Sequence, residues 1–373
     1  MMKNLFHSLP LFRGLLLATV LGGIASSCSM MHEDRDNCPD GLYIKFVYDY
    51  NLQRADMFKD HVGGVTAFVF DDNGYLVKKQ SVSNTRTDAP LKIYGYTMHV
   101  EGLNPGNYQV IALANQRGYE ETLSGKGAKY RLSDIHVGDS MSALKVVLDS
   151  DPANKEGLKI MQNSGVPLDT LWHGIVSQKI EVKNEEPTYT TVSLVRDTKN
   201  LNLTLRQIEE PTKCPIEDYD IYITDRNGTI LYDNQVDESD KLEYTPYAEW
   251  NSYFTTDGSS SSEKPSDTTT IESMVAHADL SFNRLKYRKA NDGPAMLYIY
   301  NNKHHVMVAN INLADVLAEG RSAFDYFNYS QQEYLDRAYD FNLDFFLLGD
   351  RWDYINLSLS VLPWSVRIQN EDI

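Results

Sequence analysis

The stretch that decides the fold class is residues 65–77, which read VTAFVFDDNGYLV. Runs of strand-forming residues lie on both sides of Asp71-Asp72-Asn73-Gly74. Asn-Gly tolerates the positive φ angles that a two-residue hairpin turn requires. An apolar run on each side of such a turn therefore predicts an antiparallel hairpin.

A second stretch repeats this pattern. Residues 221–231 read IYITDRNGTIL, and each stretch follows an alternating strand, residues 42–48 in the first case and 201–205 in the second. Helices are few, and the clearest signals are N-caps at Asn312 and at Ser330, which opens a capping box. We therefore predict an all-β chain with two tandem β-sandwich domains of one type, rather than an α/β fold.

Length and composition fit this architecture. The chain has 373 residues, enough for two domains that each bury a core, and its 24 tyrosines favour strands. Asp and Glu total 52 against 35 Lys and Arg, which gives a net charge of -17. So acidic a chain is a poor candidate for non-specific nucleic-acid binding, because such binding depends on Lys and Arg that neutralise phosphates.

Residues 1–27 have the layout of a secretory signal peptide. An uncharged run from residue 14 to residue 25 is too short to span a bilayer as a helix. It ends in small residues before Cys28, which resembles a bacterial lipobox, where the cysteine is acylated and becomes the mature N-terminus. We predict that Cys28 carries S-diacylglycerol and N-palmitoyl groups, enough for stable anchoring. The alternative is an ordinary signal peptide that ends near a cysteine.

The remaining chain divides into a tether and two domains. Residues 28–40 form the predicted tether, and its acidic residues resemble the surface-export signal of Bacteroidales-type lipoproteins; a merely solvated tether is the alternative. The N-terminal sandwich is placed at residues 41–186 and the C-terminal sandwich at residues 187–373. The boundary falls at Pro187, after a short polar segment between strand-like runs.

No catalytic motif stands out. The chain has no G-x-S-x-G elbow, H-E-x-x-H pair, Walker loop or G-x-G-x-x-G loop, and no pair of carboxylates is singled out as a glycosidase pair. His304 and His305 are adjacent, and neighbours in a strand point to opposite faces, so we interpret them as a surface turn rather than as metal ligands. We predict no enzymatic activity, no cofactor and no metal site.

Tryptophans and cysteines leave two questions open. The tryptophans could stack on sugars, but in alternating strands they are more often core residues, and Trp250, beside a polar loop, is the least core-like. Cys38 and Cys214 could form a disulfide in an oxidising compartment or remain free thiols. The four tryptophans are Trp172, Trp250, Trp352 and Trp364.

The order and spacing of the motifs resemble the fimbrium anchoring subunits of Bacteroidales-type (type V) pili, over nearly the whole mature chain. Two departures are the loose lipobox and the Leu-Pro pair before Trp364. The segments that carry the resemblance are Cys28, 37–39 (NCP), 42–50 (LYIKFVYDY), 56–58 (DMF), 65–74, 102–115, 193–196 (SLVR), 200–205, 283–285 (NRL), 332–337 (QEYLDR), 341–348 and 364–367 (WSVR).

The resemblance implies two transthyretin-like β-sandwich domains, a surface-exposed lipid anchor in the outer membrane, and a non-catalytic role. Such subunits hold the pilus to the cell at its base and limit its length. The implied partners are major or accessory pilin subunits. An accessory or tip adhesin subunit and a surface glycan-binding lipoprotein are the alternatives.

Two expectations concern single strands. The strand at residues 42–48 should stay in the mature protein, because a cut after Arg54, like that in related polymerising subunits, would separate the folded chain from its lipid. The terminal segment should contact pilin by strand exchange, with Trp364, Val366 and Ile368 in pockets of the partner. The alternative is that this segment is the last strand of its own domain.

Overall fold

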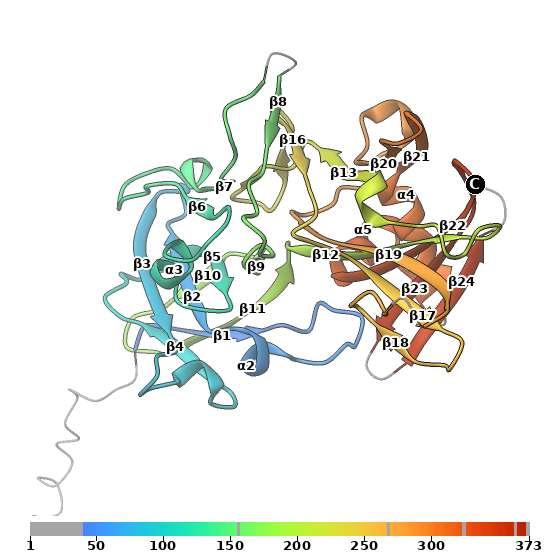
Figure 1. Ribbon diagram of the computed structural model, residues 1–373. Helices are drawn as coiled ribbons and strands as arrows, with labels where there is room; N and C mark the ends of the chain where they lie inside the picture. Colours follow the sequence, from blue (N-terminus) through green and yellow to red (C-terminus); the bar gives the residue numbers. More distant parts are fainter. Residues whose placement is uncertain (1–39, 155–156, 267–268, 323–325, 362–363, 371–373) are drawn as a thin grey trace, which may run out of the picture.

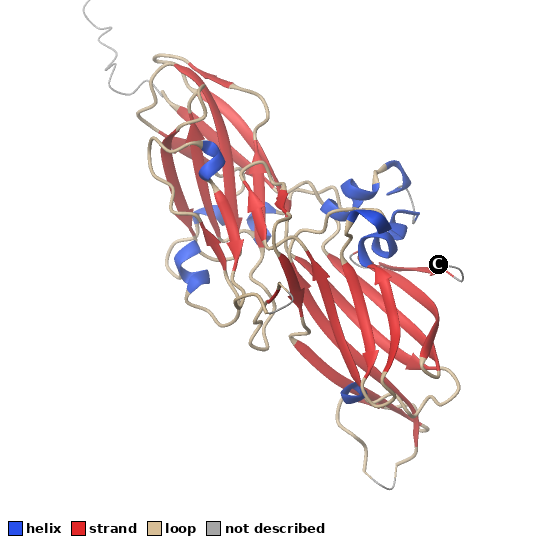
Figure 2. Ribbon diagram, turned by 90° about the horizontal axis from the view of Figure 1, so that it is seen from above, coloured by secondary structure: helices blue, strands red, loops and turns tan. Residues whose placement is uncertain are grey.

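The strands form four sheets that pack in two stacks (Figure 1, Figure 2). The computed structural model describes residues 40–154, 157–266, 269–322, 326–361 and 364–370. Strands dominate both stacks and the helices are short, so the predicted all-β fold class is confirmed. In this part of the chain, no helix has the length and apolar character needed to cross a membrane. The signal peptide, Cys28 and the tether up to residue 39 lie outside the described residues.

An eight-stranded sheet dominates the first stack, with the order β3-β2-β5-β9-β11-β1-β4 and with β10 paired to β5. β11 joins two layers, because its N-terminal part pairs with β1 and its C-terminal part with β9. Ile44 and Phe46 of β1 therefore share a core with Val69 of β2 and Val110 of β5. The strands are β1 (Leu42–Val47), β2 (Gly64–Phe70), β3 (Leu76–Ser83), β4 (Thr97–Val100), β5 (Gly106–Asn115), β9 (Leu171–Ile175), β10 (Ile180–Val182) and β11 (Thr188–Arg196).

β2 is buried along its whole length because layers cover both of its faces. Ala67 and Val69 pack in the core with β1, whereas Phe68 and Phe70 pack with Val146 of a four-stranded sheet, β15-β14-β7-β6. This explains the almost continuous apolar run in β2. The strands of the small sheet are β6 (Tyr130–Leu132), β7 (Lys145–Leu148), β14 (Thr229–Leu231) and β15 (Val236–Asp237).

The hairpin predicted at residues 65–77 is confirmed. β2 and β3 pair in antiparallel register, with one β-bulge near the turn. In the turn, one carboxylate oxygen of Asp71 accepts hydrogen bonds from the main-chain N–H groups of Asn73 and Tyr75, each at 2.9 Å. Gly74 has a φ of 79°, which residues with a side chain rarely adopt.

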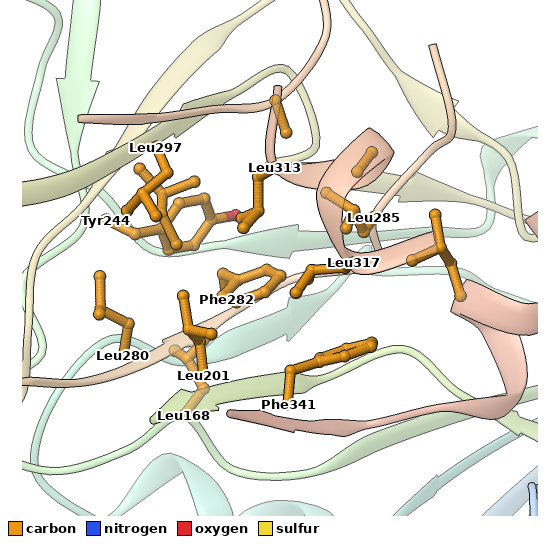
Figure 3. Close-up of a cluster of buried hydrophobic side chains, with 14 of the residues drawn as sticks. Leu168, Leu201, Tyr244, Leu280, Phe282, Leu285, Leu297, Leu313, Leu317 and Phe341 are labelled. Carbon is orange, nitrogen blue, oxygen red and sulfur yellow. The ribbon is translucent and has the colours of Figure 1, made fainter. Parts of the chain in front are cut away.

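The second stack is a seven-stranded sheet, β18-β17-β19-β12-β22-β23-β24, packed on a five-stranded sheet, β21-β20-β13-β16-β8. Figure 3 shows the core, where Leu201 and Phe341 of the larger sheet share one apolar cluster with Tyr244 and Leu297 of the smaller sheet. The strands are β8 (Leu158–Ile160), β12 (Lys199–Gln207), β13 (Tyr219–Asp225), β16 (Lys241–Tyr244), β17 (Ala248–Thr255), β18 (Ser260–Ser261), β19 (Ile271–Phe282), β20 (Met296–Asn301), β21 (Val306–Asn312), β22 (Asp340–Leu348), β23 (Arg351–Val361) and β24 (Trp364–Asn370).

The second predicted hairpin, at residues 221–231, is wrong. β13 pairs with β16 and β20, whereas β14 pairs with β7 and β15 in a different sheet. The reason is Asn227, which is fully buried. Its amide nitrogen donates to the carbonyl oxygens of Asn283 and Arg284 at 3.1 and 3.0 Å, and its amide oxygen accepts from the Tyr244 hydroxyl at 2.6 Å. Asn227 is therefore an interior hydrogen-bonding residue, not a turn residue.

Each half of the sequence contributes a strand that pairs with a strand from the other half. β8 comes from the first half and pairs with β16 of the five-stranded sheet, and β14 comes from the second half and pairs with β7. β11, which follows the predicted boundary, belongs to the eight-stranded sheet, and the chain enters the seven-stranded sheet at β12. The division between residues 186 and 187 stays a prediction.

Both predicted helix caps are confirmed. The Asn312 side chain accepts from the Asp315 N–H at 3.3 Å, and the Ser330 hydroxyl accepts from the Glu333 N–H at 3.1 Å. The α-helices are α2 (Phe58–His61), α3 (Tyr119–Leu123), α4 (Leu313–Ala318) and α5 (Gln331–Arg337). The 3₁₀ helices are η2 (Pro90–Lys92), η3 (Met141–Ala143), η4 (Ile216–Asp218), η5 (Ala290–Asp292), η6 (Glu319–Ser322) and η7 (Tyr326–Asn328).

Candidate functional site

The predicted pilin-contact residues lie on β24. Its backbone pairs with β23 in antiparallel register from residue 364 to residue 370. Trp364, Val366 and Ile368 are alternate residues of this strand. β24 is the last strand in its sheet order, and no other described strand pairs with its second edge. The predicted lipidation site, Cys28, lies outside the described residues.

β1, the strand that should stay in the mature protein, is internal. It pairs in parallel with β11 and in antiparallel register with β4. Leu42, Ile44 and Tyr48 are fully buried, and Phe46 is 2% exposed. Full burial of one such side chain stabilises a fold by about 1.5–3 kcal/mol. Loss of β1 would therefore remove several such contributions and open the core of the first stack.

A buried lysine lies where β11 passes into β12. Lys199 is 0% exposed, and its ammonium group donates to the carbonyl oxygens of Arg196, Asp336 and Ala338 at 2.9, 3.1 and 2.8 Å. Asp336 and Ala338 lie at the C-terminal end of α5, where carbonyl groups lack partners within the helix. Lys199 therefore fastens α5 to the start of β12.

Acidic and basic groups surround this lysine. Arg284 binds Asp336 through two hydrogen bonds, at 3.0 and 2.8 Å, and its Nε lies 4.0 Å from the Asp197 carboxylate. Burial raises the pKa of Asp197 and lowers the pKa of Lys199. The three carbonyl acceptors hold Lys199 in its protonated form, because a neutral amine can donate only two hydrogen bonds.

Perturbed pKa values often mark active sites, but this cluster is enclosed. A hollow of about 140 Å³ reaches Arg284, yet Asp197 and Lys199 do not line it. No substrate could contact those two groups without unfolding of the junction. We therefore interpret the cluster as a structural link between the sheets. Among the residues that the structure describes, no three His, Cys, Asp or Glu side chains are placed to hold a metal ion.

Three of the tryptophans, and the adjacent histidines, lie where the sequence indicated. Trp172 is fully buried and Trp352 packs against the core, whereas the half-buried Trp250 stacks on His277, with ring centroids 4.9 Å apart. His304 and its neighbour His305 are exposed residues of a turn, as predicted. The His304 ring lies 2.6 Å from a carboxylate oxygen of Asp350.

Cys214 is a buried free thiol. It donates a hydrogen bond to the carbonyl oxygen of Leu205 at 3.4 Å, and burial raises its pKa to about 11. Its thiolate fraction at neutral pH is therefore small, and the group is unreactive. Cys38, the other half of the disulfide considered above, lies outside the described residues.

A model of the family described as fimbrillin-A associated anchor proteins Mfa1 and Mfa2 matches residues 35–370. The chain belongs to this family. The resemblance to fimbrium anchoring subunits is thereby confirmed. The minor fimbrium anchoring subunit Mfa2 of Porphyromonas gingivalis is 23% identical over 247 residues. That match covers 65% of this chain and 66% of the relative, just under two thirds of its length.

Solved structures of anchor-family and related proteins share the fold. The fimbrial anchor protein Mfa2 from Porphyromonas gingivalis superposes with a TM-score of 0.59 at 15% identity, over 88% of this chain and 99% of that one. A structure from Bacteroides thetaiotaomicron, described as candidate polysaccharide binding proteins, has a TM-score of 0.66 at 27% identity, over 89% and 99%.

Sequence reasoning missed the residues that link the sheets. Lys199 precedes an alternating strand, where a lysine is usually a surface residue, and nothing local distinguishes it. Asn283 and Arg284 were present only as part of the family resemblance. Their role depends on Asn227 and Asp336, more than 50 residues away in each case, so no local pattern predicts it.

Proposed function

We propose that the protein is an outer-membrane lipoprotein that anchors fimbriae to the cell surface and limits their length, without catalysis. The match of the anchor family over residues 35–370 carries this proposal. The signal-peptide layout before Cys28 supports a lipid anchor. The internal position of β1 adds support, because this strand lies directly between the tether and the core.

Metabolic labelling with a fatty-acid analogue tests the anchor. Wild type should be labelled and Cys28→Ala should not, and cells with the variant should release fimbriae into the medium. Cells that lack the protein should carry fewer and longer fimbriae. Equal labelling of both proteins would contradict the lipid anchor, and unchanged retention and length without the protein would contradict the anchoring role.

The same role requires that β1 stay attached. Peptide mapping of the membrane-bound protein should recover residues 42–54 in covalent continuity with the remainder. A membrane-associated species that begins after Arg54 would contradict this, because its lipid would have been lost with the removed segment.

We further propose that β24 contacts pilin by strand exchange. Its position at the end of the sheet order supports this, because an edge strand offers unpaired backbone groups to a partner. A folded, lipidated Val366→Asp protein that releases pili supports donation, since burial of an unpaired carboxylate in the partner costs several kcal/mol. Unfolding of Val366→Asp would identify the segment as core, and unchanged folding and retention would refute the contact.

A surface glycan-binding or adhesin role is the second candidate. The half-buried Trp250, stacked on His277, favours it, as does the relative described as a candidate polysaccharide binding protein. Glycan-array binding that Trp250→Ala abolishes would support this candidate over the anchor. Neighbouring genes for fimbrial subunits would favour the anchor, and genes for glycan transport would favour glycan binding.

A further inference from the structure

We propose that the open edge of β3 is a docking site for an extended segment of a fimbrial subunit, which would add a strand to the eight-stranded sheet. The identity of the partner rests on the proposed function. The site is separate from the place of β1, which is filled, and from β24, which would be donated rather than receive a segment.

The backbone of β3 presents unpaired groups at regular intervals. The Asn84 N–H donates to the Gly63 carbonyl oxygen at 2.7 Å, in register with the β2–β3 ladder. In an antiparallel pair the hydrogen-bonded residues alternate, so those of β3 that bond to β2 have even numbers. The N–H and C=O groups of Lys79, Ser81 and Ser83 therefore point away from the sheet, and no described strand pairs with them.

A groove of about 930 Å³ lies over the face of the sheet and extends to this edge strand. Thr66 and Leu113 lie on neighbouring strands of the sheet, and Tyr119 of α3 and Leu132 of β6 also line the groove. Figure 1 shows α3 beside β3. One end is narrow, because a side chain at Gly118 would meet Ser83 at 3.1 Å. The groove therefore spans β5, β2 and the edge strand β3.

The groove carries four charged side chains, and the ammonium group of one of them, Lys79, lies 5.6 Å from the centroid of the Phe68 ring. Lys79 and Arg86 lie on the β3 side, and Glu120 and Glu121 lie on α3. All four side chains are exposed, and none forms an ion pair with another residue that the structure describes, so their charges remain available to a partner. The first turn of α3, which carries Glu120 and Glu121, lies toward the Ser83 end, because its N-cap residue Gly118 lies against Ser83. A complementary antiparallel segment would carry a basic residue at that end and an acidic residue opposite Lys79.

The regular spacing favours a peptide over a glycan. Outward groups on alternate residues repeat every 6.6 to 6.8 Å or so, which is the repeat of a second strand. Lysines on an edge strand also serve to discourage strand addition. If Lys79 contacts an acidic residue of the partner, reversal of its charge should weaken binding. If Lys79 only discourages strand addition, reversal of its charge should not weaken binding.

Proline substitution tests the backbone directly. Proline removes one N–H, and at an outward-facing position on an edge strand it leaves the β2–β3 ladder intact. Ser81→Pro in the full chain should weaken binding of a purified fimbrial subunit from the same cells by at least about tenfold, because one interstrand hydrogen bond is lost and the added ring hinders approach. The matched control Ser81→Ala keeps the N–H and should bind within about threefold of wild type.

If Ser81→Pro melts well below wild type, a second pair of variants tests the docking site instead. Lys79→Glu should weaken binding, and Lys92→Glu, which makes the same charge change outside the groove, should not. Binding by Ser81→Pro equal to wild type, equal weakening by Ser81→Pro and Ser81→Ala, or equal effects of the two charge reversals would overturn the docking site while the anchoring role stands. No binding of the fimbrial subunit to wild type would overturn both proposals.

Discussion

Replacement of Lys199 by methionine should destabilise the protein strongly. Methionine fills a similar volume but has no donor, so the carbonyl groups of Arg196, Asp336 and Ala338 would lose the hydrogen bonds made by the ammonium. Each unsatisfied buried polar group costs about 1–3 kcal/mol. Removal of one partner from a buried charge cluster costs about 3–5 kcal/mol in measured cases. The three carbonyl groups together would cost about 3–9 kcal/mol, and the measured cases narrow the expected loss to about 3–5 kcal/mol.

Thermal unfolding followed by circular dichroism measures this loss. At about 2–4 °C per kcal/mol for domains of 150–250 residues, Lys199→Met should lower Tm by roughly 10 °C. Lys92→Met is the matched control, because Lys92 is exposed and the same chemical change there should leave Tm nearly unchanged. A Tm for Lys199→Met within about 2 °C of wild type would refute the structural role assigned to the buried ammonium.

Three further predictions concern buried positions in the first and second stacks. Burial lowers the pKa of His173 to about 4 from 6.5, so the unfolded chain binds a proton first, and the free energy of unfolding should fall by about 1.5 kcal/mol between pH 6.5 and 5. His173→Gln should remove this part of the pH dependence of Tm, and an unchanged dependence would contradict it. Gly174→Ala would place a Cβ 2.5 Å from a methyl carbon of Val192, so urea denaturation should show a loss of about 1–3 kcal/mol, and unaltered stability would argue against so tight a fit. Cys214 should react with a thiol reagent only after denaturation, and rapid labelling of the folded protein would disprove its burial.

The features that the sequence predicted depend on local interactions. The turn at residues 71–74 needs only the Asp71 carboxylate and the conformation of Gly74, both within the turn itself. The cap at Ser330 involves an N–H three residues away. Only the Ser330 half of that capping box is observed, because the Glu333 carboxylate accepts from Arg337 Nε at 3.0 Å instead.

The second hairpin shows why the remaining features were not predictable. The same Asp-x-Asn-Gly pattern occurs there, but the Asn227 side chain donates hydrogen bonds to main-chain carbonyl groups 56 and 57 positions further along the chain. Once its side chain is buried, a solvent-exposed turn is excluded and the chain continues into another sheet. The groove beside β3 could likewise not be predicted from the sequence, because it depends on how α3 and β6 lie over a sheet face.

Reciprocal exchange of strands also has a mechanical consequence. β8 leaves the first half of the sequence to join the sheet of β16, and β14 leaves the second half to join the sheet of β7. A tensile load between the two ends of the chain would have to break both sets of backbone hydrogen bonds, and the contacts of Lys199, before the two stacks could separate. Under load the molecule should therefore unfold as one unit, with a single rupture force, rather than extend at a hinge between two independent domains.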